Sequence, residues 1–116
     1  MRYVLVGILI IIIIMRMLPA KGVRHITTAD LKNELRDGEK LFIDVRTKGE
    51  FNKRNIKEFK NIPLYELPYK TNELTSNKEI VLICQSGMRS NKAAKLLRRK
   101  GFNKVANVKG GMSAWS

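Results

Sequence analysis

The sequence is poor in the residues on which cross-linked and metal-binding small domains depend. A single cysteine among 116 residues excludes an intramolecular disulfide framework. With only one histidine beside it, a zinc site built from Cys and His is not expected, and we predict no metal ion. Eight glycines and three prolines are too few for a disordered or collagen-like chain. The length and the remaining composition are those of one folded domain.

Acidic residues are also scarce: 10 Asp and Glu stand against 23 Lys and Arg, which gives a formal net charge of +13. Five basic residues crowd one segment, namely Lys92, Lys95, Arg98, Arg99 and Lys100. A solvated basic face is the simplest interpretation, while attraction to an anionic membrane surface and steering of an acidic partner or anionic ligand are alternatives. Nucleic acid is not expected as a partner, because no aromatic residues are interleaved with the basic ones and no recognised binding motif is present.

The N-terminus carries the one long apolar run, from Tyr3 to Met15, between Arg2 and Arg16. A membrane-spanning helix needs about 20 apolar residues and at least about 17, so the run is short, although the stem of Arg16 can extend to the interface. We predict a transmembrane helix at residues 1–18, a short linker at 19–24 and a folded domain at 25–116. The basic residues after the run predict a single-pass protein of the cell membrane whose domain faces the cytoplasm. A cleaved signal peptide is the alternative for residues 1–18.

Short apolar segments typical of strands alternate with helical segments over the rest of the chain. The strongest strand is Glu79 to Cys84, which is apolar after its first residue and rich in β-branched residues. An amphipathic helix is predicted at 90–100, and further strands at 41–45, 59–62 and 104–108. This alternation predicts an α/β domain of three layers, with a central, mostly parallel sheet covered by helices on both faces. Ligands of such sheets bind at the carboxyl ends of the strands, where Cys84 lies.

A short loop containing a glycine joins this strand to the helix, and the loop starts at the only cysteine. Backbone N–H groups of such a loop can converge on the Cys84 sulfur, and the N-terminus of the following helix adds partial positive charge. Both effects favour the thiolate, which is the nucleophilic form of cysteine. Arg89 brings a permanent cation to the far end of the loop, where an anion could bind. We therefore expect Cys84 to be a nucleophile; a cysteine used only as a small apolar strand residue is the alternative.

Four ordered segments of the sequence resemble the rhodanese family. Residues 80–90 are similar to the catalytic strand and loop of that family. Residues 43–51 are similar to its Asp-Val-Arg-x-x-x-Glu-Phe/Tyr box, and Asn61-Ile62-Pro63 matches the Asn-Ile-Pro that follows. Residues 108–115 resemble its Gly-Gly-x-x-Ala-Trp box. Together these segments cover essentially all of the predicted folded domain.

The resemblance implies a sulfurtransferase that needs no cofactor. Cys84 would accept a sulfane sulfur as a persulfide, from thiosulfate or a persulfide donor protein, and pass it to a thiol or cyanide. The side chain of Arg89 would help to bind an anionic donor. Asp44, Arg46 and Glu50 would support the site structurally rather than transfer protons. The backbone amides that would cradle the sulfur belong to Gln85, Ser86, Gly87, Met88 and Arg89.

The sequence also departs from the family pattern, and other functions stay open. Residues 54–59 replace the common Gly-His-Ile-Pro-Gly-Ala, which puts the local turn in doubt, and Gln85 replaces a frequent arginine, which predicts weaker binding of thiosulfate. A membrane-tethered sulfur carrier or protein-interaction module with little turnover is the main alternative. A phosphatase or arsenate reductase is a further one, but such relatives have a seven-residue loop, whereas six residues run from Cys84 to Arg89.

Overall fold

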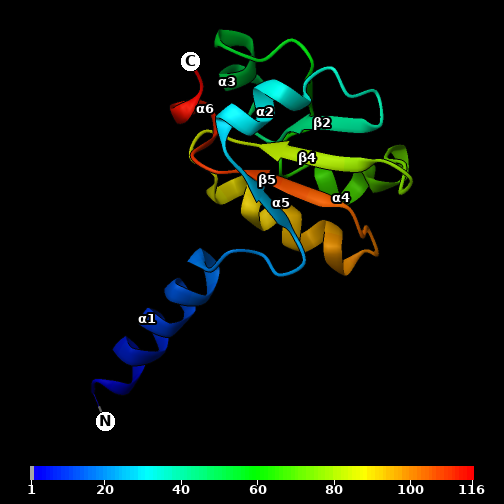
Figure 1. Cartoon of the computed structure of the whole chain (residues 1–116). Coiled ribbons are helices and arrows are strands. Elements are labelled where there is room, and N and C mark those ends of the chain that lie inside the picture. The colour runs from blue at the N-terminus through cyan, green and yellow to red at the C-terminus, as the bar shows by residue number, and fades with distance from the viewer. Residues whose placement is uncertain (1) are drawn as a thin grey trace.

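Five parallel strands form the centre of the molecule, in a computed structural model that describes residues 2–116 (Figure 1). The strands lie in the order β1-β5-β4-β2-β3, and every neighbouring pair is parallel. Their bounds are Arg24–Ile26 for β1, Lys40–Asp44 for β2, Lys60–Asn61 for β3, Glu79–Ile83 for β4 and Val105–Val108 for β5. The predicted parallel sheet is confirmed, and β4 occupies its centre. The edge strand β1 was not predicted.

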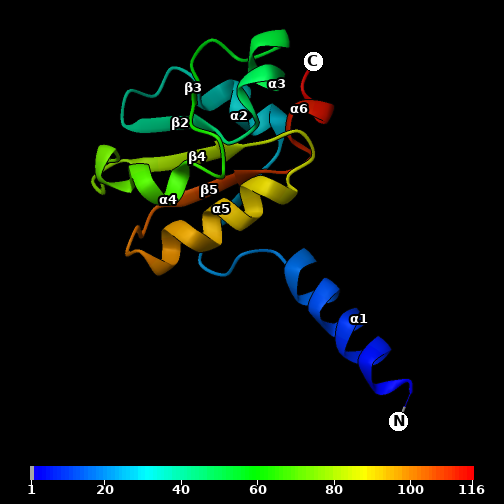
Figure 2. The same cartoon turned by 180° about the vertical axis from the view of Figure 1, so that it is seen from behind.

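Helices cover both faces of the sheet, which confirms the three predicted layers (Figures 1 and 2). One face carries α4 (Leu67–Lys70), the short 3-10 helix η1 (Thr71–Glu73) and α5 (Met88–Arg99). The other face carries α2 (Thr28–Glu34), α3 (Lys48–Lys53) and α6 (Gly111–Ala114). Alternate residues of β4 fill the two cores: Ile80 and Leu82 pack toward α4 and α5, while Val81 and Ile83 pack toward α2 and α6.

The helices that follow β1 and β2 start at hydroxyl caps encoded in the sequence. Thr27 Oγ1 accepts a hydrogen bond from Asp30 N, and Thr47 Oγ1 accepts one from Glu50 N. In each case the acidic side chain accepts in return from the backbone N–H of the threonine, which completes a capping box. These caps fix the starts of α2 and α3, so that the segments between strand and helix stay short.

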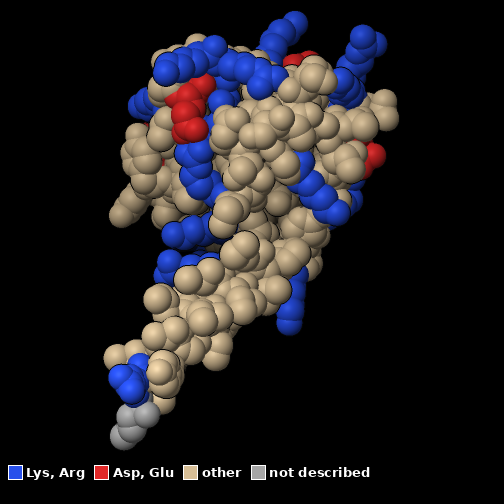
Figure 3. All heavy atoms as spheres, turned by 90° about the vertical axis from the view of Figure 1, so that its left-hand side faces the viewer, with Lys and Arg blue, Asp and Glu red and all other residues tan. Residues whose placement is uncertain are grey.

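The N-terminal run forms a helix, α1 (Val4–Met17), but the prediction that it spans a membrane is wrong. Its 14 residues rise only about 21 Å, whereas the apolar core of a bilayer is about 30 Å thick. Within residues 2–116 no helix has the length and apolar character needed to cross a membrane. The predicted transmembrane helix, and with it the single-pass location in the cell membrane and the membrane as a partner, are therefore corrected. In Figures 1 and 3, α1 projects from the domain.

The segment after α1 is attached to the domain through one buried asparagine of α5. Asn91 Oδ1 accepts a hydrogen bond from Ala20 N at 2.8 Å, and Asn91 Nδ2 donates to Leu18 O at 2.8 Å. Ala20 is itself buried in the apolar core between α5 and the sheet. Two bonds to one side chain hold this segment in a defined path toward β1, beside the start of α5.

Candidate active site

Cys84 lies at the carboxyl end of the central strand β4, where the sequence placed it. Its side chain is buried and is the only thiol of the chain. Two hydrogen-bond donors reach its sulfur: Gly87 N lies 3.0 Å from Cys84 Sγ, and Ser90 Oγ lies 3.3 Å from it. Both donors come from the loop and first turn of α5, so the arrangement can stabilise negative charge on the sulfur.

Gly87 provides the backbone geometry that this contact requires. It caps α5 with φ of +99°, a left-handed conformation that side-chain-bearing residues rarely adopt. A Cβ at this position would also lie 3.3 Å from Gly110 N. The amide of Gly87 can therefore turn toward the sulfur while its other side packs against the turn after β5. Its neighbours Ser86 and Met88 are exposed.

The carbonyl groups of the cysteine loop are held from outside by α6. Met112 N donates to Cys84 O and Ser113 N donates to Gln85 O, both at 2.9 Å. The Gln85 side chain adds a bond from Nε2 to Ser113 Oγ at 3.1 Å. Because the carbonyl groups point to α6, the Gly87 amide is left free to face the sulfur. The segment 108–115 thus shapes the loop, although α6 itself is short.

Arg89 and Glu50 form a two-pronged ion pair between α5 and α3. Arg89 Nη1 lies 2.7 Å from Glu50 Oε1, and Arg89 Nη2 lies 2.8 Å from Glu50 Oε2. Hydrogen bonding to Arg89, aided by the Thr47 cap, lowers the pKa of Glu50 from 4.5 to about 2. The same pairing raises the pKa of Arg89. The guanidinium beside the loop is therefore already engaged by a carboxylate, and any anion would have to share it.

Asp44 and Arg46 form a second ion pair, which is buried under the segment after β2. Arg46 Nη2 donates to Asp44 Oδ2 at 2.8 Å, and Arg46 N donates to Asp44 Oδ1 at 2.9 Å. The arginine also donates to the carbonyl oxygens of Glu50 and Arg54, at 3.3 and 2.6 Å. Across residues 2–116, no side-chain hydrogen bond joins either member of the pair to the cysteine loop. The pair instead ties the segment after β2 to both ends of α3.

The turn at residues 54–59 forms without the histidine and glycines of the family pattern. Phe59 N donates to Ile56 O at 2.9 Å, and the side chains of Ile56 and Phe59 are buried. Arg54 Nη1 donates to Met112 O at 3.0 Å, which links the turn to α6. The core contacts of the two apolar residues stabilise the turn in place of glycine flexibility.

Two buried polar residues that were not expected as site residues from the sequence complete the site. Ser90 Oγ lies 2.5 Å from Asn107 Oδ1 as well as 3.3 Å from Cys84 Sγ. Both Ser90 and Asn107 are buried. A signal for Asn107 was present, since it is the one polar residue within the strand Val105–Val108. Ser90 could have been found from its place in the first turn of the helix, which points back to the loop.

Comparisons with known proteins identify the family of the chain. Residues 27–116 match the family of rhodanese-like domains. YtwF of Bacillus subtilis, provisionally named a sulfurtransferase, is 42% identical over 94 residues, which are 80% of this chain and 90% of YtwF. YrkF of the same organism, provisionally named a sulfur carrier protein, is 39% identical over 98 residues; these are 84% of this chain but only 53% of YrkF. The chain thus spans about half the length of that relative.

A solved structure gives the same picture of the fold. The rhodanese-like domain protein from Staphylococcus aureus superimposes with a TM-score of 0.75 at 35% sequence identity. The superposition covers 81% of this chain and 92% of that protein. The N-terminal helix and the segment that leads from it precede the matched residues 27–116.

Proposed function

The chain belongs to the family of rhodanese-like domains, and on this premise we propose that it is a sulfurtransferase that carries sulfane sulfur as a persulfide on Cys84. The observation that carries the proposal is the Gly87 N–H at 3.0 Å from Cys84 Sγ, at the carboxyl end of the central strand. The thiolate is the form of cysteine that attacks an electrophilic sulfur atom, and the Gly87 N–H is placed to donate a hydrogen bond to that sulfur.

With thiosulfate as donor, the Cys84 thiolate attacks the outer sulfur of thiosulfate. A bond forms between the two sulfur atoms, the bond from the outer sulfur to the sulfite group breaks, and sulfite leaves with the electron pair. The loop amide and the Ser90 hydroxyl are placed to stabilise the anionic sulfur before and after transfer. A thiol or cyanide then attacks the outer sulfur of the persulfide and releases Cys84 as a thiolate.

Intact mass spectrometry tests this proposal directly. After incubation with thiosulfate, or with a persulfide donor protein, the folded protein should gain about 32 Da, the mass of one sulfur atom. Addition of cyanide or a thiol should remove the added mass. Cys84→Ser is the control and should gain nothing. A folded wild-type protein that forms no adduct with either donor would contradict the proposal.

A second candidate is a sulfur carrier or interaction module that turns over slowly with small molecules. The engagement of Arg89 by Glu50 favours it, because the cation nearest the loop is not free for a small anionic donor. In this case thiosulfate would load Cys84 poorly, a persulfide donor protein would load it well, and a partner protein would still bind to Cys84→Ser. Comparing loading rates with the two donors separates the candidates.

A further inference from the structure

The Ser90 hydroxyl lies among three acceptor atoms but has one proton to donate. Its Oγ is 2.5 Å from Asn107 Oδ1 and 3.3 Å from Cys84 Sγ. The carbonyl oxygen of Gly87 is a third acceptor, at 3.1 Å. A hydroxyl group has one O–H donor and two acceptor lone pairs, so it donates fully to one of these atoms at a time. The shortest contact is the one to Asn107, which therefore competes most closely with the sulfur for this proton.

The sheet holds Asn107 beside this hydroxyl. Asn107 of β5 is paired with Leu82 of β4, two residues before Cys84. The strands β1 and β4 flank β5 on its two sides, so the backbone at Asn107 is fixed by both neighbours. Ser90 and Asn107 are both buried. The contact between them is thus built into the core rather than made by chance at the surface.

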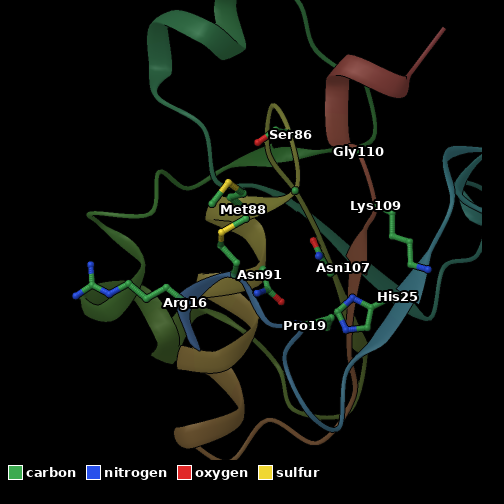
Figure 4. Close-up of a pocket in the computed structure, with 11 residues that line it drawn as sticks. Arg16, Pro19, His25, Ser86, Met88, Asn91, Asn107, Lys109 and Gly110 are labelled. Carbon is green, nitrogen blue, oxygen red and sulfur yellow. The ribbon is translucent and has the colours of Figure 1, made fainter. Parts of the chain in front are cut away.

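An asparagine amide can serve the hydroxyl in two ways, because its oxygen accepts a hydrogen bond and its nitrogen donates one. A half-turn of the amide exchanges Oδ1 and Nδ2 in front of Ser90. Asn107 also lines a pocket of about 340 Å³ behind the cysteine loop, together with Ser86 and Gly87 (Figure 4). This pocket gives the amide room for such a half-turn.

Two arrangements satisfy all of these groups, and they differ in the protonation of the sulfur. With Oδ1 toward Ser90, as in this structure, the Ser90 proton goes to Asn107, and a Cys84 thiol can donate its own proton to Ser90 Oγ. With Nδ2 toward Ser90, the amide donates to Oγ and the Ser90 proton goes to a Cys84 thiolate. A thiolate combined with Oδ1 toward Ser90 leaves one buried acceptor without a donor, which is costly.

We propose that Asn107 is a positioning residue that directs the Ser90 proton, and that its amide turns when Cys84 changes from thiol to thiolate. Asn107 acts through Ser90 rather than on the sulfur itself. The inference rests on the proposed function, in which the thiolate occurs twice: it attacks the donor, and it is released when the acceptor takes the sulfur. No further reagent is needed, since the thiol proton passes to water while the Ser90 proton and the amide only change direction.

The charged groups around the site stay the same in every comparison that tests this role. Arg89 of α5 interacts with the charge of the sulfur and is paired with Glu50 of α3. Asp44 at the end of β2 is paired with Arg46. The pocket behind the cysteine loop adds three basic or titratable residues, namely Arg16, His25 and Lys109. A difference between variants that keep all of these groups comes from the hydrogen bonds.

The test is a titration of the only thiol of the chain, which requires neither a substrate nor access to the buried sulfur. The ultraviolet absorbance of the thiolate is followed against pH, as the difference between each protein and the same protein carrying Cys84→Ser. Asn107→Leu has a side chain of similar size without donor or acceptor. Its thiolate loses the amide donor, whereas its thiol form keeps a place for the Ser90 proton at Gly87 O. The midpoint of the titration should therefore move to higher pH by about 0.5 or more, as expected for one ordinary hydrogen bond.

Two comparisons separate this role from a merely structural one. Val105→Ala removes buried volume from the same face of β5 and should lower the free energy of unfolding while leaving the midpoint unchanged. In a protein that already carries Ser90→Ala, Asn107→Leu should have no further effect on the midpoint, because the hydroxyl proton through which it acts is gone. If Asn107→Leu does not fold, Asn107→Asp takes its place. Its carboxylate only accepts, so it should raise the midpoint more in the presence of the Ser90 hydroxyl than in its absence.

The outcomes distinguish this inference from the proposed function. A midpoint that Asn107→Leu leaves unchanged, or moves equally with and without the Ser90 hydroxyl, would overturn the role of Asn107. A shift of the same size in Val105→Ala would also overturn it. Below the midpoint, sulfur loading from thiosulfate should be about threefold slower in Asn107→Leu than in the wild type. Failure of wild-type Cys84 to load sulfur would count against the proposed function, and the titration would still decide the role of Asn107.

Discussion

At the residue scale, the shape of the cysteine loop depends on a glycine outside it. Gly111 begins α6 with φ of +54°, and a Cβ at this position would lie only 2.1 Å from Cys84 O. The obstacle is backbone rather than a flexible side chain, so it cannot move aside without moving the loop. The close approach allows Met112 N to reach Cys84 O, which orients the peptide groups that follow the sulfur.

Gly111→Ala is therefore expected to displace the cysteine loop and to slow sulfur loading at least tenfold. It should also lower the free energy of unfolding by about 2 kcal/mol or more, since overpacking and backbone strain both contribute. Gly49→Ala is the matched control. Gly49 lies within α3, where an added Cβ meets nothing within 4 Å, and alanine there should stabilise the protein by about 0.5–1 kcal/mol. Urea unfolding and loading followed by intact mass measure both effects; normal loading by Gly111→Ala would contradict this account.

The sequence was informative about residues that motifs mark and silent about residues that only folding brings together. Cys84 and the loop to Arg89 could be selected because a cysteine followed by a glycine-containing loop and a helix suggests chemistry by itself. Asn107 contacts Ser90 across 17 positions of the chain, and nothing in a linear reading pairs them. The partner of Glu50 is likewise distant in sequence, since its carboxylate pairs with Arg89, 39 positions along the chain.

At the scale of elements, a single buried polar residue of α5, Asn91, binds the segment after α1. Its two bonds satisfy Ala20 N and Leu18 O, which would otherwise have to find water. This attachment also positions Met17 and Pro19 as the wall of the pocket behind the cysteine loop. The connection between the two elements is thus polar and local rather than an extended apolar interface.

Asn91→Ala should release this segment while leaving the sheet intact. Loss of the side chain leaves one backbone donor and one acceptor without partners, which costs about 1–3 kcal/mol. Hydrogen exchange of the Ala20 amide should accelerate more than tenfold, whereas amides of β4 should follow only the change in overall stability. Asn52→Ala, at an exposed asparagine of α3, is the control and should leave Ala20 unaffected. Unchanged exchange at Ala20 in Asn91→Ala would contradict the role given to this side chain.

Most elements could be predicted, and the two exceptions have clear physical causes. The helix in the isoleucine run was expected, but it does not span a membrane: α1 has 14 residues, fewer than the roughly 17 that a span needs, and the backbone is already extended at Leu18. The strand β1 has three residues, too few for an alternating pattern to be recognised, and it exists because Arg24 to Ile26 pair with β5. Pairing partners far along the chain cannot be inferred from a short segment.

At the scale of the whole molecule, the charge of the protein is unevenly divided along the chain. Residues 80–116 contain no acidic residue, and neither do residues 1–29, so all carboxylate side chains lie between Asp30 and Glu79. Figure 3 shows Lys and Arg side chains scattered over one face, with few Asp or Glu among them. Arg24, which lies in the N-terminal part that has no acidic residue, forms ion pairs with Glu34 and Glu79. These pairs lower the pKa of both carboxyl groups. The few carboxylates therefore carry much of the stabilisation by charge.

Acid should consequently unfold the protein through these groups. The pKa of Glu50 in the folded state, about 2, lies below its ordinary value of 4.5. Its contribution is therefore fully present above about pH 4.5 and is lost as the pH falls toward 2. Glu50→Gln keeps a capping side chain but loses the charge, so it should be less stable than the wild type at pH 6 and approach it near pH 2.

Urea unfolding of both proteins between pH 7 and pH 2.5 measures this difference. Glu58→Gln is the control, because Glu58 is exposed and makes no ion pair within residues 2–116. The free energy of unfolding of Glu58→Gln should stay close to that of the wild type at every pH. A gap between Glu50→Gln and the wild type that does not narrow in acid would show that the ion pair with Arg89 is not its source.

The position of β1 at the edge of the sheet has a consequence for the time at which the protein acquires its fold during synthesis. β1 is made early, yet its only neighbour is β5, and the residues that pair with it, Ala106 to Val108, leave the ribosome some eighty positions later. The segment before β1 must likewise wait for Asn91. The nascent chain therefore holds its first strand without a partner until the last strand emerges. Such late closure favours folding after β5 is complete, and it makes the interval before closure the period when chaperones are most needed.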